Sequence, residues 1–211
     1  MVPASSERDG DELTDGRHAR AERSRDAVVD AILELLYEGD DHPGAADIAA
    51  RAGVSLRSVF RHFDDLETLH AVAVERHAEL ISPLFELALP APPAGAEHVP
   101  FAQRVDALVR QRTKLFQEMA LVRVVADRLR DRSPSIRDGL ERSRRILRRQ
   151  VLDLFEPDLD RLAPTARRTV TDALEMVTSY GAWRQWRQDQ GLSVPRSSAA
   201  MKRSIESAKP L

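Results

Sequence analysis

The chain has 211 residues, enough for one or two domains with a hydrophobic core. It contains no cysteine, which excludes a disulfide framework, a thiolate zinc site and a cysteine nucleophile. The formal net charge is −2 at pH 7, and residues 1–80 hold 9 arginines against 18 acids, so bulk charge does not indicate a nucleic-acid partner. No apolar run is long enough to span a bilayer, and the N-terminus lacks the apolar core of a secretory signal. We therefore expect a cytoplasmic protein.

Apolar residues recur at helical spacing along nearly the whole chain, and no strand pattern is present. The sequence therefore predicts an all-α protein of about nine helices. Residues 1–16 are polar and acidic and are expected to be disordered. The first helix is predicted from about Arg20 to Glu38, where Gly39 ends it.

Two short helices follow, from Ala45 to Ala52 and from Leu56 to Phe63. Gly53 makes a tight turn between them, and Ser55 is placed to cap the second helix. Asp64 or Asp65 caps a longer helix from Leu66, which Pro83 is expected to kink or end near Ser82. Residues 90–100 are rich in proline and form a linker. The remaining helices are predicted at residues 101–118, 120–130, 134–155, 165–190 and 197–208.

Two short helices joined by a glycine turn are typical of a helix-turn-helix. The apolar residues Ile48, Ala49, Val54, Val59 and Phe63 are expected to hold the two helices together. The exposed face of the second helix then carries Leu56, Arg57, Phe60 and Arg61. Arginine can bond both acceptors of guanine in the major groove, and Phe60 can pack on a thymine methyl or on sugar. His62 and the free amides of a helix start can meet phosphate.

The stretch DIAARAGVSLRSVFRHFDDLETL, residues 47–69, resembles the signature of the tetracycline-repressor (TetR) family of transcriptional regulators. Glycine turn, cap, buried aliphatic, aromatic-x-His-Phe and capping acid fall in the family's order. The resemblance implies a helix-turn-helix DNA-binding domain at residues 17–65 and a helical ligand-binding and dimerisation domain at residues 66–211. It implies a repressor that forms a homodimer, binds a palindromic double-stranded DNA operator and is released by an unknown small molecule. The DNA-binding residues implied in this way are Arg20, Arg25, Ala45, Ala46, Ser55, Leu56, Arg57, Ser58, Phe60, Arg61 and His62. No Gly-rich phosphate loop, HExxH or GxSxG motif is present, so neither an enzyme nor a cofactor is predicted.

The arginines of the first helix have two interpretations. With Arg17 and Arg23, Arg20 and Arg25 could form an arm that reaches phosphates or the minor groove, or they could simply be the solvated start of a helix.

The C-terminal part offers candidates for a ligand cavity and for a dimer interface. The candidate cavity walls are Phe85, Leu108, Arg112, Phe116, Leu121, Val125, Leu147, Val151, Val177 and Trp183, each of which could equally be core. The candidate interface residues recur along the helix predicted at 165–190 and are Val170, Ala173, Leu174, Val177 and Gly181. The competing interpretation is that this stripe faces the chain's own core.

A second function class is a helical small-molecule or metal sensor that has lost DNA binding. Two departures from the family pattern motivate it: Phe60 replaces a usual tyrosine, and Leu66 a frequent lysine. The acidic balance of residues 1–80 points the same way. A third departure, Ala45 in place of a capping Thr or Ser, removes a possible backbone contact. Glu67 and His70 have the Glu-x-x-His spacing of di-iron bundles, but a single copy is not enough for such a site, and no metal site is predicted.

Overall fold

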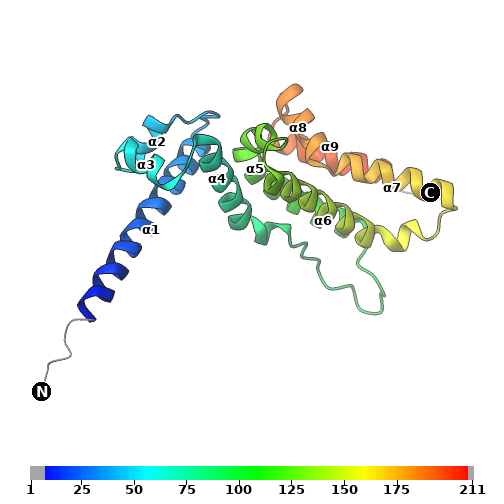
Figure 1. Ribbon diagram of the computed structural model, residues 1–211. Coiled ribbons are helices and arrows are strands. Elements are labelled where there is room, and N and C mark those ends of the chain that lie inside the picture. The colour runs from blue at the N-terminus through cyan, green and yellow to red at the C-terminus, as the bar shows by residue number, and fades with distance from the viewer. Residues whose placement is uncertain (1–7, 209–211) are drawn as a thin grey trace, which may run out of the picture. The chain divides into compact units, whose positions relative to one another are not determined.

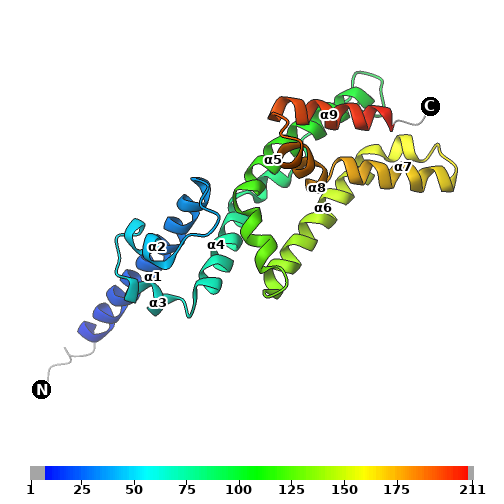
Figure 2. The ribbon, with the colours of Figure 1, turned by 90° about the horizontal axis from the view of Figure 1, so that it is seen from above.

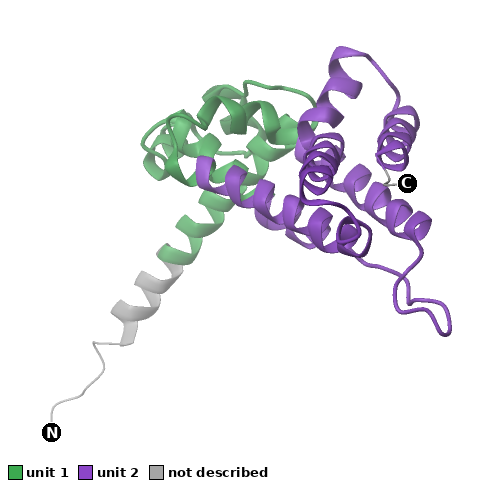
Figure 3. Cartoon of the chain, turned by 90° about the vertical axis from the view of Figure 1, so that its right-hand side faces the viewer, with its two compact units in different colours: residues 1–77, 121–136 green, residues 78–120, 137–211 purple. Residues whose placement is uncertain are grey.

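The structure is a computed structural model that describes the backbone of residues 8–208 and the side chains of residues 18–208. Within residues 8–208 there are nine α-helices, one 3-10 helix, one π-helix and no strand (Figure 1). The predicted all-α class is therefore confirmed. The chain divides into two compact units, coloured in Figure 3. Unit 1 holds residues up to His77 and residues 121–136, and unit 2 holds residues 78–120 and 137–211.

Unit 1 begins with α1 (Arg8–Tyr37), which starts at Arg8 rather than at the predicted Arg20. Residues 8–16, for which we expected disorder, are helical, and residues 1–7 lie outside the described part of the chain. The segment has no proline, and its acids lie near the helix start, where the helix dipole favours negative charge. The apolar stripe of α1 is buried, and α1 packs against α2 (Ala45–Arg51) and α3 (Leu56–His62) (Figure 2).

The turn between α2 and α3 depends on Gly53, whose φ of +66° lies in the left-handed region that favours glycine. The amide of Val54 donates to the carbonyl of Ala49 at 3.0 Å and closes the end of α2. Ser55 then caps α3, because its Oγ accepts from the amide of Ser58 at 3.2 Å. Both predicted turn features are confirmed.

The next helix, α4 (Leu66–Leu80), is capped by Asp65, whose Oδ1 accepts from the amide of Thr68 at 2.7 Å. This hydrogen bond lowers the pKa of Asp65. A 3-10 helix (Ser82–Phe85) follows with Pro83 in its first turn, so α4 ends before the proline as expected.

The division into units differs from the predicted boundary after residue 65. Unit 1 also contains α4 as far as His77, together with residues 121–136. Two long-range contacts within unit 1 hold these segments: Arg132 pairs with Glu67, and Arg128 donates to the carbonyl of Asp41. Contacts between residues far apart in sequence produce no recognisable local sequence pattern, so this unit boundary could not be predicted from the sequence.

α5 (Phe101–Leu129), whose residues 101–120 belong to unit 2, is one helix where two were predicted. Met119 and Ala120, at the expected break, are good helix formers, and no glycine or proline interrupts them. The following α6 (Pro134–Leu159) starts where predicted, with the amide of Ile136 donating to Ser133 Oγ at 3.4 Å. It continues past the predicted end at residue 155, with Pro157 in its last turn.

The helix predicted at residues 165–190 is broken. Instead the chain forms α7 (Pro164–Val177), α8 (Tyr180–Arg184) and a π-helix (Gln185–Asp189). Thr178 Oγ1 donates to the carbonyl of Leu174 at 2.7 Å, and Ser179 Oγ accepts from the amide of Ala182 at 3.1 Å. The Ser179 hydroxyl accepts from an amide that the preceding turn leaves without a main-chain acceptor, so a new helix begins at Tyr180. The last helix, α9 (Val194–Ser207), is capped by Ser193 and lies beside α7 (Figures 1 and 2).

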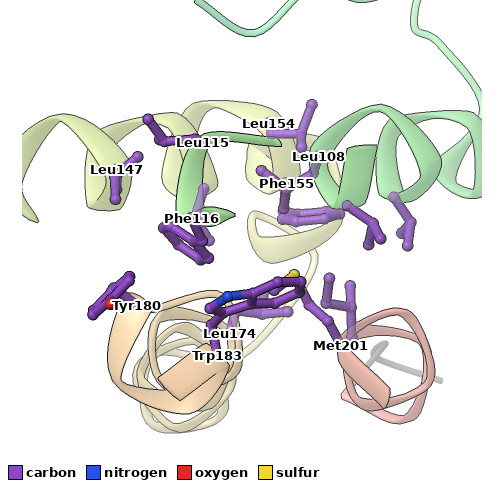
Figure 4. Packing of buried hydrophobic residues seen from close by; sticks show 14 of the residues in the cluster. Leu108, Leu115, Phe116, Leu147, Leu154, Phe155, Leu174, Tyr180, Trp183 and Met201 are labelled. Carbon is purple, nitrogen blue, oxygen red and sulfur yellow. The ribbon is translucent and has the colours of Figure 1, made fainter. Parts of the chain in front are cut away.

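The core of unit 2 joins side chains of α5 and α6 to those of α7, α8 and α9 (Figure 4). Phe116 meets Tyr180 edge-on, with ring centroids 5.6 Å apart, and Trp183 at 6.1 Å. Met201 and Ile205 bring α9 into the same cluster. Large apolar side chains thus supply most of this unit's stabilisation.

Arg104 of α5 is buried in this unit together with a counter-charge. Its Nη2 lies 2.7 Å from Oδ2 of Asp158, an ion pair rather than an aligned hydrogen bond. Its Nε donates to the carbonyl of Val99 at 2.9 Å. The guanidinium also lies 5.6 Å from the ring centroids of Phe101 and Phe155. The charge of Arg104 is therefore compensated by Asp158, and its guanidinium is held by contacts within unit 2.

Replacing Arg104 by methionine should lower the free energy of unfolding by about 3–5 kcal/mol, because Asp158 is left without its counter-charge. Urea unfolding followed by circular dichroism measures this change. Arg110→Met, at an exposed arginine of the same helix, is the matched control and should stay within about 0.5 kcal/mol of the wild type. Equal effects of the two substitutions would contradict the structural role of Arg104.

Replacing Gly53 by alanine should destabilise the protein by about 1–2 kcal/mol, since the left-handed backbone disfavours a Cβ. No atom lies within 4 Å of the added Cβ, so the effect comes from the backbone alone. Gly139→Ala, inside α6 and also with open space, should instead stabilise by about 0.5–1 kcal/mol. Thermal unfolding of both variants checks the opposite signs, and a shared sign would contradict the turn geometry.

Candidate nucleic-acid interface

The inner face of α3 is fixed by burial. Val59 and Phe63 are buried, as are Ile48 and Ala49 of α2. Phe63 lies just past the end of α3, where its amide donates to the carbonyl of Val59 at 3.0 Å. Four of the five residues predicted to hold the helices together are therefore buried, and Val54 is half-buried. The opposite face of α3 is left to the solvent.

That outer face carries four side chains that sequence reasoning placed there. Leu56 is 47% exposed and Phe60 is 48% exposed, so two large apolar side chains face the solvent on this helix. Arg57 and Arg61 are exposed as well. Among the described residues no carboxylate pairs with either arginine, although Arg61 Nη2 lies 3.5 Å from His62 Nε2. Neither positive charge is therefore neutralised by an acid. We call these four residues the α3 face.

Arg51 of the same unit, in contrast, has a structural role, because it forms ion pairs with two acids. Its guanidinium pairs with Glu34 Oε2 at 3.2 Å and Glu38 Oε2 at 2.8 Å, which ties α2 to α1. The hydrogen bonds from Arg51 lower the pKa of Glu38. The acids of α1 are thus partly neutralised within the unit. The charge of the α3 face is not cancelled in this way.

His62 ends α3 and is half-buried. Burial lowers its pKa, and the positive charges of Arg61 and Arg25 lower it further. The lowered pKa favours the neutral imidazole. In that state it can donate one hydrogen bond to a phosphate but adds no positive charge.

The predicted arm residues lie in different surroundings. Arg20 is exposed. Arg25 is half-buried, and its guanidinium lies 5.1 Å from the centroid of the Phe63 ring, a cation–π contact that the sequence did not predict. Arg23 donates to the carbonyl of Ala19 within α1 at 3.1 Å. The side chain of Arg17 lies outside the described residues. Whether these arginines reach DNA stays a prediction.

The remaining predicted contact residues lie at the starts of α2 and α3. Ala46 is exposed and Ala45 is half-buried, and no side chain caps α2 at Gly44. Ser55 and Ser58 are occupied with each other, with their Oγ atoms 3.0 Å apart, in addition to the cap. The main-chain amides at the start of α2 have no side-chain acceptor, which matches the absence of the usual Thr or Ser there.

The predicted cavity residues are brought together only in part. Leu121 and Val125 belong to unit 1 and the other eight to unit 2. Within unit 2, Leu108, Phe116, Leu147, Val151 and Trp183 are members of the buried cluster, and Phe85 and Val177 pack against it. Arg112 is fully buried on α5. In the structure, the seven apolar residues of unit 2 thus lie in or against its core. Whether any of the ten line a ligand cavity stays a prediction.

The predicted dimer stripe is changed by the break after Val177. Gly181 belongs to α8 and not to the helix of the other four residues. Leu174 is buried in the chain's own core, as the competing interpretation held. Ala173 is exposed, and Val170 and Val177 are half-buried. Met176 is 67% exposed beside them, a residue the prediction missed. We call Val170, Ala173, Met176 and Val177 the α7 face.

Two further negative findings concern the described residues. No helix among them is both long and apolar enough to cross a membrane. No group of three or more potential metal ligands is found among them, and Glu67 of the Glu-x-x-His spacing pairs with Arg132.

Comparison with known proteins places the fold. No protein-family model and no curated protein matches the sequence. A TetR-family transcriptional regulator from Streptomyces coelicolor matches with a TM-score of 0.61 at 15% identity, over 89% of this chain and 79% of that one. A transcriptional regulator from Rhodococcus sp. Rha1 matches with a TM-score of 0.58 at 18% identity, over 89% and 95%.

A third match is NalD, the secondary repressor of the MexAB-OprM multidrug efflux pump in Pseudomonas aeruginosa. Its TM-score is 0.51 at 20% identity, and the match covers 90% of this chain and 97% of NalD. These matches extend along most of both chains, well beyond the 47–69 signature. The protein therefore has the fold of TetR-family transcriptional regulators.

Proposed function

We propose that the protein is a sequence-specific DNA-binding transcriptional regulator, and that α3 enters the major groove of its operator. The observation that carries the proposal is the α3 face, with two arginines that have no carboxylate partner and two exposed apolar side chains on a helix-turn-helix. Arg57 and Arg61 would bond guanine, and Phe60 would contact a thymine methyl or sugar. The TetR-family fold supports this assignment.

The regulator would act as a repressor that a small molecule releases. A ligand bound in unit 2 lowers DNA affinity only if it binds more tightly to a conformation that fits the operator poorly. NalD, with a similar fold, is a repressor, which supports the sign of the effect. One helix-turn-helix reads only a few base pairs, so we further propose a two-fold dimer on a palindromic operator.

The second candidate, a sensor that has lost DNA binding, is favoured by the acidic balance of residues 1–80. A gel shift with the DNA that flanks the protein's own gene decides between the two. Specific retardation supports the regulator. No retardation at low salt supports the sensor.

Arg57→Ala and Arg61→Ala should each weaken operator binding by about 1–3 kcal/mol, because each removes contacts to a base edge. Fluorescence anisotropy with a labelled operator measures the affinity, and circular dichroism checks that helicity is unchanged. Arg137→Ala, at an exposed arginine of α6 in unit 2, is the control and should leave affinity unchanged. Wild-type affinity in both α3 variants would refute the assignment.

The α7 face provides the test of assembly. Ala173→Glu should give a folded monomer with weakened operator binding, because a two-fold contact would oppose two buried charges. Light scattering and circular dichroism measure mass and helicity. Ala102→Glu makes the same change at an exposed alanine of α5 and should leave the dimer intact. A dimeric Ala173→Glu variant with native helicity would place the interface elsewhere.

A further inference from the structure

Arg112 is a fully buried arginine with an incomplete set of partners. Its Nη1 donates to Gln150 Oε1 at 2.8 Å and to Gln111 Oε1, and its Nη2 donates to the carbonyl of Leu147 at 2.9 Å. A guanidinium carries five N–H donors, two of them on Nη2. The Nε of Arg112 has no acceptor, and Nη2 has only one. The Nε–H and one of the two N–H groups of Nη2 are thus unused.

Arg112 also lacks a counter-charge. Among the described residues no carboxylate pairs with it, whereas Arg104, two turns earlier on the same helix, has Asp158. Burying an unpaired charge costs free energy of folding, so buried charges are normally paired with an opposite charge. Burial lowers the pKa of Arg112 to about 9, and the side chain is still charged at neutral pH. The positive charge is therefore present and uncompensated.

Two glutamines hold the guanidinium in this orientation. Gln111 Nε2 donates to the carbonyl of Leu84 at 2.7 Å, and Gln150 Nε2 donates to the carbonyl of Phe85. Each amide is anchored at its nitrogen and turns its oxygen to Nη1 of Arg112. Nε and one N–H of Nη2 stay without an acceptor, and a carboxylate can bind Nε and Nη2 of a guanidinium with two parallel hydrogen bonds.

The surroundings of Arg112 are otherwise apolar. Leu108 and Phe116 lie one helical turn before and after it on α5, and both are fully buried. Phe116 in turn faces the rings of Tyr180 and Trp183 (Figure 4). A ligand that reached Nε and Nη2 would therefore have one anionic group and an apolar body.

We propose that Arg112 is the anion-binding residue of a ligand site in unit 2 that takes a small hydrophobic carboxylate. The carboxylate pairs with Nε and Nη2, and the aliphatic or aromatic body lies beside Phe116 and Trp183. This ligand would be the effector of the proposed regulator, and only that effector role rests on the proposed function. Because Arg112 is fully covered, the ligand binds a rearranged conformation better than the one described.

The test uses the full-length protein without DNA and two matched probe pairs, octanoate with octanamide and 4-phenylbutyrate with 4-phenylbutanamide. The chain's two tryptophans, Trp183 and Trp186, both lie in unit 2, so tryptophan fluorescence reports binding there. At least one carboxylate should bind about 10- to 100-fold more tightly than its neutral amide. Equal affinities within both pairs, or no carboxylate binding up to about 10 mM, would overturn the proposal.

Variants assign the effect to Arg112. Arg112→Met should abolish the preference for the carboxylate, whereas Arg110→Met, which removes the same charge from the exposed side of α5, should keep it. The melting temperature of Arg112→Met without ligand should be unchanged or raised, since an uncompensated buried charge has been removed. A retained preference in Arg112→Met, or its loss in Arg110→Met, would refute the assignment. If Arg112→Met does not fold, Arg112→Lys, which lacks the two-donor edge, should lose the preference.

The outcome is separate from that of the proposed function. Carboxylate binding is measured without operator, and operator binding of Arg57→Ala is measured without carboxylate. If the protein retards no DNA but binds the carboxylate through Arg112, the regulator fails and the ligand site stands. If it binds operator but no carboxylate, the regulator stands and the ligand site fails.

Discussion

The backbone of Gly53 turns through the left-handed region, and the orientation of α3 depends on that turn. The chain leaves α2 through the Val54 amide bond to Ala49 and enters α3 at once through the Ser55 cap. With the turn fixed, Val59 and Phe63 face inward, and the α3 face is turned to solvent as a consequence. A residue with a Cβ at position 53 would disfavour the left-handed backbone conformation on which the Val54 hydrogen bond, the Ser55 cap and the burial of Val59 and Phe63 depend.

Most of unit 1 could be predicted because its determinants are local. Helical spacing marks α2 and α3, and a glycine, a serine and an aspartate mark the turns and caps within a few residues of the elements they define. The same helical spacing predicted from the sequence alone which residues form the α3 face. Ser133 and Pro134 likewise marked the start of α6 from sequence alone.

Two kinds of feature could not be predicted from the sequence. Some depend on contacts between residues distant in sequence, and others on whether a helix continues or ends at residues that are compatible with both. The acidic partners of Arg51 and Arg104 lie 13 or more residues away, so the sequence near either arginine did not distinguish a structural role from a free charge. Ser179 could lie within a continuous helix or cap a new one, and in the structure its Oγ accepts from the amide of Ala182 and caps α8. The buried position of Arg112 is hidden for the same reason, since arginine is normally exposed.

The α7 face has a chemical property that its shape does not convey. Met176, its most exposed member, carries a thioether that oxidants can reach, and oxidation converts this apolar side chain into a polar sulfoxide. Ala173 beside it is small, and Val170 and Val177 are half-buried, so no other large apolar side chain of this face replaces the lost surface. The affinity of the α7 face for any apolar partner is therefore tied to the redox state of a single sulfur atom.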